Sequence, residues 1–269
     1  MRLIISILFL FYCSAIYSQQ WMPATELPVS DSIAFVSFDN LSNIYLISND
    51  SKLYRQNPGT KQLYSYQNTR LGSIGSIDVT DPFKILVFYP LFQTIITLDN
   101  TLTQIGKLDF HDNTIGTIRS ISRSTDNNIW IYDESNRLID KISTGGKILI
   151  KGIPNYDLKL TPLATAQLFQ DNNLLFLTQT GKPVYVFDQF GKFDHQIILP
   201  TDAKFIHIHD FIYYISDGDL RRYDYTKPAL MADEVIIKGI NSKENFSLDF
   251  SKNKIYKIDN NNNLSYLQF

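Results

Sequence analysis

The sequence predicts an all-β fold, a six-bladed β-propeller with four-stranded blades, and three observations predict it. A unit of about 42 residues recurs six times. Short apolar strands within each unit end at Asp, Asn, Gly or Pro turns. The last unit lacks a fourth strand, which the N-terminal segment can supply. Aromatic residues make up 13% of the chain, a composition that also favours strands.

The repeat is marked by a polar turn followed by an apolar strand. Its six copies place that strand at Ile44, Ile85, Ile129, Leu174, Ile212 and Ile255, at intervals of 38 to 45 residues. A period of this length with several short strands per unit is typical of a propeller blade. Six units account for residues 19–269, so the sequence predicts one propeller and no second domain.

Each unit divides into four short strands. In the first unit they are expected at residues 32–39, 43–50, 51–57 and 61–67. The second strand of each unit is apolar at nearly every position, whereas a sheet with one solvated face would alternate. Because a blade has a neighbour on both faces, this pattern favours a propeller over a simple sandwich.

The two ends of the chain predict how the ring closes. The sixth unit stops after three strands, and residues 20–29 precede the first unit without belonging to one. We expect this N-terminal segment to be the outermost strand of the last blade. Pro23 and Pro28 are tolerated there, because one side of an edge strand needs no backbone donor.

Residues 1–18 have the layout of a secretory signal peptide, with a basic start, an apolar run over 3–12 and small residues up to Ser18. The run is too short for a membrane span of about 20 residues, so we expect no membrane insertion of the mature form. The mature chain would lack cysteine, which suits a bacterial periplasm, outer membrane or extracellular location. The alternative is a lipoprotein attached through Cys13, which the bulky Tyr12 disfavours.

The blade number, the blade length and the Asp or Asn turn before the second strand resemble those of secreted six-bladed propellers of the TolB-like and NHL-like superfamily. The resemblance covers residues 20–269 and includes no catalytic motif. That group contains scaffolds, ligand binders and lactonases, so the resemblance implies a fold and not a function.

Two histidines are the candidate metal ligands. His207 and His209 stand at i and i+2 of an expected innermost strand and so share one face, and Asp210 follows them. With a further ligand from another blade, these groups would suit one divalent metal ion. The alternative is that they are hydrogen-bonded residues near the central channel.

Other polar groups fit structural roles better. Carboxylates recur at the strand turns and are expected to cap them through side-chain hydrogen bonds, namely Asp39, Asp81, Asp126 and Asp171. A propeller lactonase would resemble this fold but hold its metal with a Glu among its ligands. None of the four glutamates of the chain stands on an expected innermost strand. They are Glu26, Glu134, Glu234 and Glu244. No serine-hydrolase or zinc-protease motif is present.

Two features predict a binding surface. Tyr89 and Phe92 are expected in the loop between the second and third strands of the second blade, where apolar side chains on a solvated rim favour a contact site. The alternative is that they pack against the adjacent blade. Arg70, Arg119 and Arg123 are expected near the starts of innermost strands, where arginine can bind a carboxylate or phosphate. The alternative for them is a solvated or ion-paired surface.

The formal net charge of −2 gives no positive field that would attract DNA or RNA. The sequence therefore predicts a non-enzymatic scaffold or binding module of the bacterial envelope, a monomer or a subunit of a larger complex. We expect its partner to be an envelope protein or a polysaccharide, with no cofactor. The alternative is a metal-dependent hydrolase or lactonase with one divalent metal ion at the channel mouth.

Overall fold

The computed structural model describes residues 21–24, 29, 31–110, 115–162, 165–240, 245–259 and 263–269. The expected signal peptide, Cys13, Glu26, Pro28, His111 and Glu244 lie outside these ranges. Within them, no helix is long and apolar enough to span a bilayer.

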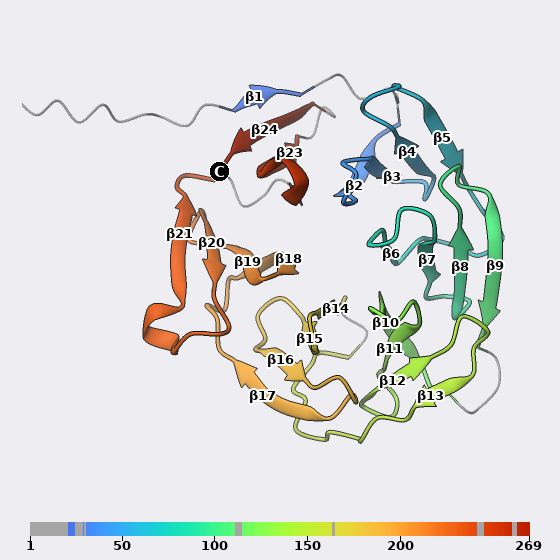
Figure 1. Ribbon diagram of the computed structural model, residues 1–269, viewed down its shortest axis with the longest axis vertical. Coiled ribbons are helices and arrows are strands. Elements are labelled where there is room, and N and C mark those ends of the chain that lie inside the picture. The colour runs from blue at the N-terminus through green and yellow to red at the C-terminus, as the bar shows by residue number, and fades with distance from the viewer. Residues whose placement is uncertain are drawn as a thin grey trace, which may run out of the picture.

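Six four-stranded antiparallel sheets form a ring around a central axis (Figure 1). From the axis outward, blade 1 contains β2 (Ile33–Phe38), β3 (Ile44–Ser48), β4 (Leu53–Gln56) and β5 (Leu63–Tyr66). Blade 2 contains β6 (Ser76–Asp78), β7 (Ile85–Tyr89), β8 (Thr94–Leu98) and β9 (Gln104–Asp109). Blade 3 contains β10 (Ile118–Arg123), β11 (Ile129–Asp133), β12 (Leu138–Ile142) and β13 (Ile148–Ile150).

The remaining blades follow the same order. Blade 4 contains β14 (Gln167–Asp171), β15 (Leu174–Thr178), β16 (Val184–Phe187) and β17 (Phe193–Ile197). Blade 5 contains β18 (Lys204–His209), β19 (Phe211–Ser216), β20 (Asp219–Tyr223) and β21 (Asp233–Ile237), with the short 3-10 turn η1 (Ala229–Met231) before β21. Blade 6 contains β22 (Asn245–Asp249), the 3-10 turn η2 (Phe250–Lys252), β23 (Lys254–Ile258), β24 (Leu264–Gln268) and β1 (Met22–Pro23).

The N-terminal strand closes the last blade, as the sequence predicts. β1 pairs antiparallel with β24, and Met22 lies opposite Tyr266. The backbone N–H of Ala24 extends the pairing by donating to the carbonyl of Leu264 at 2.9 Å. Pro23 therefore stands on an outermost strand, where its missing donor is tolerated. The innermost strands of the first and last blades, β2 and β22, also contact each other, which completes the ring.

The hydrophobic core is divided into six clusters, and each cluster lies between two neighbouring blades. β7 shows how this works: Val87 points into the cluster shared with blade 1, and Phe88 points into the cluster shared with blade 3. Successive side chains of a strand face opposite sides of its sheet. A middle strand must therefore be apolar at consecutive positions, which is the pattern that the sequence shows.

Candidate functional site

The topology sorts the loops onto two faces of the ring. On the top face the innermost strands begin, and the loops between the second and third strands of each blade lie beside those starts. On the bottom face the innermost strands end. The candidate surface lies on the top face over blades 2 to 4 and is built from residues 67–75, 90–93, 134–137 and 151–162.

Two loops meet on the top of blade 2. In residues 90–93, Leu91 is 75% exposed and Phe92 is 41% exposed. The loop 67–75 packs against them, since a Cβ added to Gly72 would lie 3.1 Å from the Leu91 side chain, and the φ of +74° at Gly72 also favours glycine. This loop carries the exposed Arg70. The structure thus places the predicted Arg70 and Phe92 on one face of one blade.

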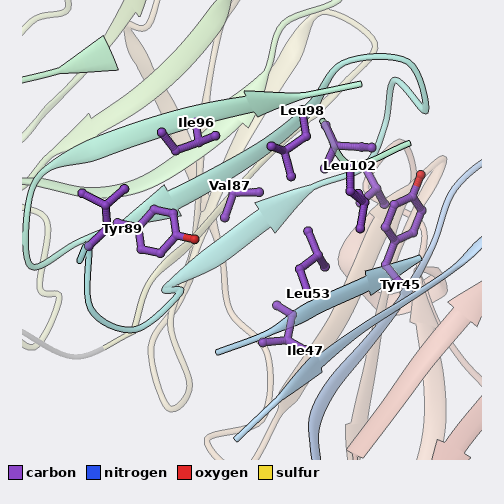
Figure 2. Close-up of a cluster of buried hydrophobic side chains, with 11 residues drawn as sticks. Tyr45, Ile47, Leu53, Val87, Tyr89, Ile96, Leu98 and Leu102 are labelled. Atoms are coloured by element: carbon purple, nitrogen blue, oxygen red, sulfur yellow. The ribbon is translucent and has the colours of Figure 1, made fainter. Parts of the chain in front are cut away.

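The prediction that Tyr89 is a loop residue is wrong. Tyr89 is the last residue of β7 and is 0% exposed. Figure 2 shows it inside the cluster between blades 1 and 2, beside Val87 and Ile96. Burial is the main reason why the pKa of its phenol is raised. Strand alternation turns Tyr89 toward blade 1, so it offers no surface to a partner.

Gln93 joins the top of blade 2 to blade 3. Its side-chain amide donates to the carbonyl of Ile118 at 3.1 Å and accepts from the backbone N–H of Ile118 at 2.7 Å. This reciprocal pair fixes the start of β10 against the loop that carries Phe92. The next residue, Arg119, forms an ion pair with Glu134 at 2.7 Å. Arg119 therefore lies on the predicted face, but Glu134 already neutralises its charge.

A pocket of about 220 Å³ opens between the top of blade 3 and the connection to blade 4. It is lined by Tyr132, Glu134, Ser135, Arg137, Leu158, Leu160 and Pro162. The guanidinium of Arg137 lies 5.9 Å from the ring centre of Tyr156, which is 75% exposed, and donates to its carbonyl at 3.4 Å. In the described part of the chain, no carboxylate oxygen lies within 4.0 Å of this guanidinium.

The connection that forms one wall of the pocket is held at both ends. Its first residues are fixed by Asp140, which accepts from Lys151 Nζ at 2.6 Å and from the backbone N–H of Gly152 at 2.8 Å. A Cβ on Gly152 would lie 2.2 Å from the carbonyl oxygen of Ile139, so only glycine allows this approach. Further along, the backbone N–H of Thr161 donates to the Gln179 side chain at 2.6 Å. These contacts give the pocket a fixed shape.

The sequence interpretation did not find the residues of this pocket. Arg137 stands in a four-residue turn like many others, and the three residues before it, Glu134, Ser135 and Asn136, are polar. The available signal is the connection itself, because residues 151–166 form the longest link between consecutive strands. Long connections with no strand of their own often carry function. The apolar side chains in it, such as Leu158 and Leu160, would then have drawn attention to blade 3.

The prediction that Arg123 lies near the start of an innermost strand is also wrong. Arg123 is the last residue of β10, so it lies on the bottom face, and it is buried. Its guanidinium donates to the carbonyls of Lys84 and Asn127, and its backbone N–H donates to Asp78 at 2.7 Å. These bonds join the ends of β6 and β10. Arg123 therefore has a structural role between blades 2 and 3.

The two candidate metal-binding histidines share one face, as expected. His207 and His209 lie on β18, with ring centres 5.0 and 5.2 Å from the ring centre of Phe250. Burial is the main reason why the pKa of His207 falls to about 4, although a part of its side chain reaches solvent. His209 is exposed, and its nearest carboxylate oxygens, from Asp171 and Asp210, are both 3.9 Å away.

A complete metal site is not formed by these groups. Across the described ranges, no three or more His, Cys, Asp or Glu side chains lie close enough together to hold a metal ion. Asp210 is exposed and contributes its backbone N–H to Asp171. The cluster on β18 therefore consists of an imidazole pair packed on Phe250, and metal binding there stays a prediction.

The turn carboxylates mostly have the predicted role. Asp39 accepts from the backbone N–H groups of Leu41 and Asn43, both at 2.9 Å. Asp81 accepts from Phe83 at 2.9 Å, and Asp126 from Asn128 at 3.2 Å. Asp171 differs, because it accepts from Tyr225 in the next blade at 2.8 Å. Three of the four thus cap their own turns, and the fourth connects two blades.

Known proteins share this architecture. No family model matches the chain, and no curated protein matches it in sequence. Streptogramin B lyase is 13% identical, with 91% of this chain and 85% of that chain covered at a TM-score of 0.59. An auxiliary nutrient binding protein from Bacteroides ovatus is 9% identical, with 88% and 69% covered at 0.63. YCF48 bound to D1 peptide is 14% identical, with 94% and 83% covered at 0.53.

The likeness is one of fold. These solved structures support the predicted propeller fold, and the resemblance to the TolB-like and NHL-like superfamily stays a prediction. At such low identity they carry no function to this chain, because one propeller scaffold serves enzymes and binding proteins alike.

Proposed function

We propose that this propeller is a non-enzymatic binding module that presents its top face, over blades 2 to 4, to a protein partner in the bacterial envelope. One observation supports the proposal above the others. Exposed apolar side chains, Leu91, Phe92 and Tyr156, share this face with the cations of Arg70 and Arg137, which have no carboxylate partner among the described residues. Large apolar and arginine side chains are enriched in protein interfaces.

The rigidity of the surface supports binding further. Gln93 ties the loop of blade 2 to blade 3, and Asp140 and Gln179 fix the wall of the pocket. A surface that is already ordered loses little conformational entropy when a partner binds. Functional loops on a fixed scaffold are a common arrangement in binding proteins.

Two further points bear on where and what the module binds. The export-signal layout of residues 1–18 supports a place in the periplasm or on the cell surface. Among the proteins of similar fold, one is a nutrient binding protein and another was solved with a bound peptide. Both are compatible with a propeller that acts through a surface rather than through a reaction.

The test is affinity capture from a native envelope extract, with matched variants on opposite faces. Leu91→Ala combined with Phe92→Ala removes the apolar rim on the top face. Phe83→Ala removes a side chain that is 59% exposed in a loop on the bottom face. We expect the double variant to recover at least tenfold less partner than the unmodified chain, and Phe83→Ala to recover the same amount. Equal recovery by both variants would contradict the proposal.

Two further experiments test the alternatives of a polysaccharide partner and a metal-dependent hydrolase. Protease digestion of the extract should abolish capture, whereas survival of capture would point to a polysaccharide partner instead. Metal analysis of the purified mature protein tests the hydrolase alternative. One tightly bound divalent ion per chain, lost in His207→Ala, would replace the binding module with a metal-dependent enzyme.

A further inference from the structure

The pocket on blade 3 has a size that fits one or two side chains. Its volume of about 220 Å³ is below the ~300–1,000 Å³ that is typical of sites for whole small molecules. Its apolar wall consists of Leu158, which is buried, with Leu160 and Pro162 beside it. An apolar wall with a few polar groups at the rim is suited to a side chain that is presented by a longer ligand.

The charge at the rim is positive. Arg137 can donate five N–H bonds, and one of them goes to the carbonyl of Tyr156 at 3.4 Å. Glu134 also lines the pocket, but its charge is neutralised by the ion pair with Arg119 at 2.7 Å. The net local charge is therefore that of Arg137, and a planar guanidinium binds a carboxylate through two parallel hydrogen bonds.

Neutral hydroxyl groups complete the rim. Burial, with a further effect of the Glu134 charge, raises the pKa of Tyr132 to about 12, so its phenol keeps its proton at neutral pH. The Ser135 hydroxyl accepts from the backbone N–H of Thr117 at 3.1 Å, which fixes its position. A hydroxyl that accepts one bond can donate its own proton to a ligand oxygen.

Two further cations are exposed on the top face. Lys159 lies on the connection that forms the wall, where the exposed Asp157 offsets its charge, and Arg70 lies on the top of blade 2. Within the described part of the chain, neither is paired with a carboxylate. On the bottom face, three of the six innermost strands end at a carboxylate, Asp78, Asp171 and Asp249, and these carboxylates accept hydrogen bonds from the neighbouring blades.

We propose that this pocket binds an extended peptide segment of the partner protein, with a carboxylate on Arg137 and the adjacent apolar side chain against Leu158, Leu160 and Pro162. The inference rests on the proposed function and names the chemistry that the binding module selects. The pair between the carboxylate and Arg137 orients the peptide, and the apolar contact increases its affinity without adding another charge.

The test uses a display pool of random heptapeptides, selected on the immobilised mature chain. We expect Asp or Glu next to an apolar residue to be enriched at least fivefold over the starting pool. The enrichment should fall to the pool level for Arg137→Gln and persist for Lys192→Gln, which removes an exposed charge on the bottom face. Arg137→Lys keeps the charge but loses the planar fork, and should give an intermediate enrichment.

A selected peptide then provides a quantitative check. Replacing its Asp or Glu by Asn or Gln should weaken binding to the unmodified chain at least tenfold. The same replacement should change binding to Arg137→Gln by less than twofold, because the partner of the carboxylate is already absent. Thermal unfolding of Arg137→Gln serves as the folding control, since its midpoint should match that of the unmodified chain.

The outcomes separate this inference from the proposed function. Peptides selected without a preference for carboxylates would overturn the inference and leave the binding module standing. Carboxylate peptides that bind Arg137→Gln equally well would overturn the assignment of Arg137. If no peptide is retained above background while capture of an envelope protein succeeds, the partner binds through a folded surface and the peptide inference fails.

Discussion

The two faces of the ring use charged side chains in opposite ways. On the bottom face, carboxylates at the ends of innermost strands bond to the following blade. Asp78 accepts from the Arg123 backbone at 2.7 Å, Asp171 accepts from Tyr225 at 2.8 Å, and Asp249 accepts from Ser42 at 3.1 Å. The top face over blades 2 to 4 instead leaves the guanidinium groups of Arg70 and Arg137 without a carboxylate partner among the described residues.

The bottom-face bonds follow the order of the ring. Each connects an even-numbered blade to the next one, from blade 2 to 3, from 4 to 5 and from 6 to 1. The last of these joins blade 6, which contains the C-terminal strands, to blade 1, so it also supports closure of the ring. Charge on this face stabilises the contacts between blades. Among the described residues over blades 2 to 4, the guanidinium groups of Arg70 and Arg137 make no such contact, which leaves these two groups available to a ligand.

The largest expected effect comes from breaking one of these bottom-face bonds. Asp171→Ala removes the acceptor for the Asp210 backbone N–H and for the Tyr225 hydroxyl. Both donors lie in blade 5. Without the Asp171 carboxylate, the free-energy cost of removing these donors from water is no longer offset by a hydrogen bond. We expect the free energy of unfolding to fall by about 2–4 kcal/mol, measured by urea denaturation with far-UV and near-UV circular dichroism.

The matched control is Asp81→Ala. Its side chain accepts from the Phe83 backbone within the same loop and reaches no other blade through a described bond. The expected loss is about 0.5–1 kcal/mol, the value of a local turn bond. If the two variants lose equal stability, the bonds between blades are not what distinguishes the bottom face.

The sequence predicts the ring better than it predicts the surface, for a physical reason. Consecutive apolar residues such as Val87 and Phe88 predict burial on both faces of a strand, and the structure confirms it. Turn residues act locally, so Asp39 could be interpreted from its own neighbours. These features depend on contacts within a few residues or on a regular period.

The candidate surface depends on register and on distant segments. Whether Tyr89 ends a strand or begins a loop changes its direction completely, and a single position decides it. The same applies to Arg123, which lies five residues after Ile118 and so at the opposite end of β10. The pocket joins Arg137, in a loop within blade 3, to Leu158, in the connection from blade 3 to blade 4. No local pattern contains such a contact.

A smaller effect is expected from pH, and it arises at the bottom half of the channel. Burial and the neighbouring His209 lower the pKa of His207 to about 4, and Asp78 and Asp171 act in the opposite direction. An exposed histidine has a pKa of about 6.5. Between these values the unfolded chain binds more protons than the folded chain. Stability is therefore full above pH 6.5 and falls as the pH drops toward 4.

The contribution of His207 to this loss should be about 1–3 kcal/mol between pH 7 and pH 4.5, within the limit set by the pKa difference. The measurement is urea unfolding across that range for the unmodified chain and for His207→Asn. The variant should show a shallower dependence on pH. Identical dependences would mean that His207 is hydrated enough to titrate as it does in the unfolded chain.

The smallest expected effect on stability comes from the top face, and it is the sharpest test of the comparison. Arg70→Gln and Arg137→Gln should each change the free energy of unfolding by less than about 0.5 kcal/mol, because exposed charges away from strong partners contribute little. Arg123→Gln on the bottom face removes a buried guanidinium that donates to Lys84 and Asn127 and should cost about 1–3 kcal/mol. Thermal and urea unfolding measure all three.

The outcomes at Arg137 and Arg123 decide the comparison. A loss of stability at Arg137 as large as that at Arg123 would show that the fold itself holds the top-face cation in place, and its position would then be no argument for ligand binding. A loss confined to Arg123 would show that the fold gains little stability from Arg137, as the proposed role of Arg137 in binding a ligand requires.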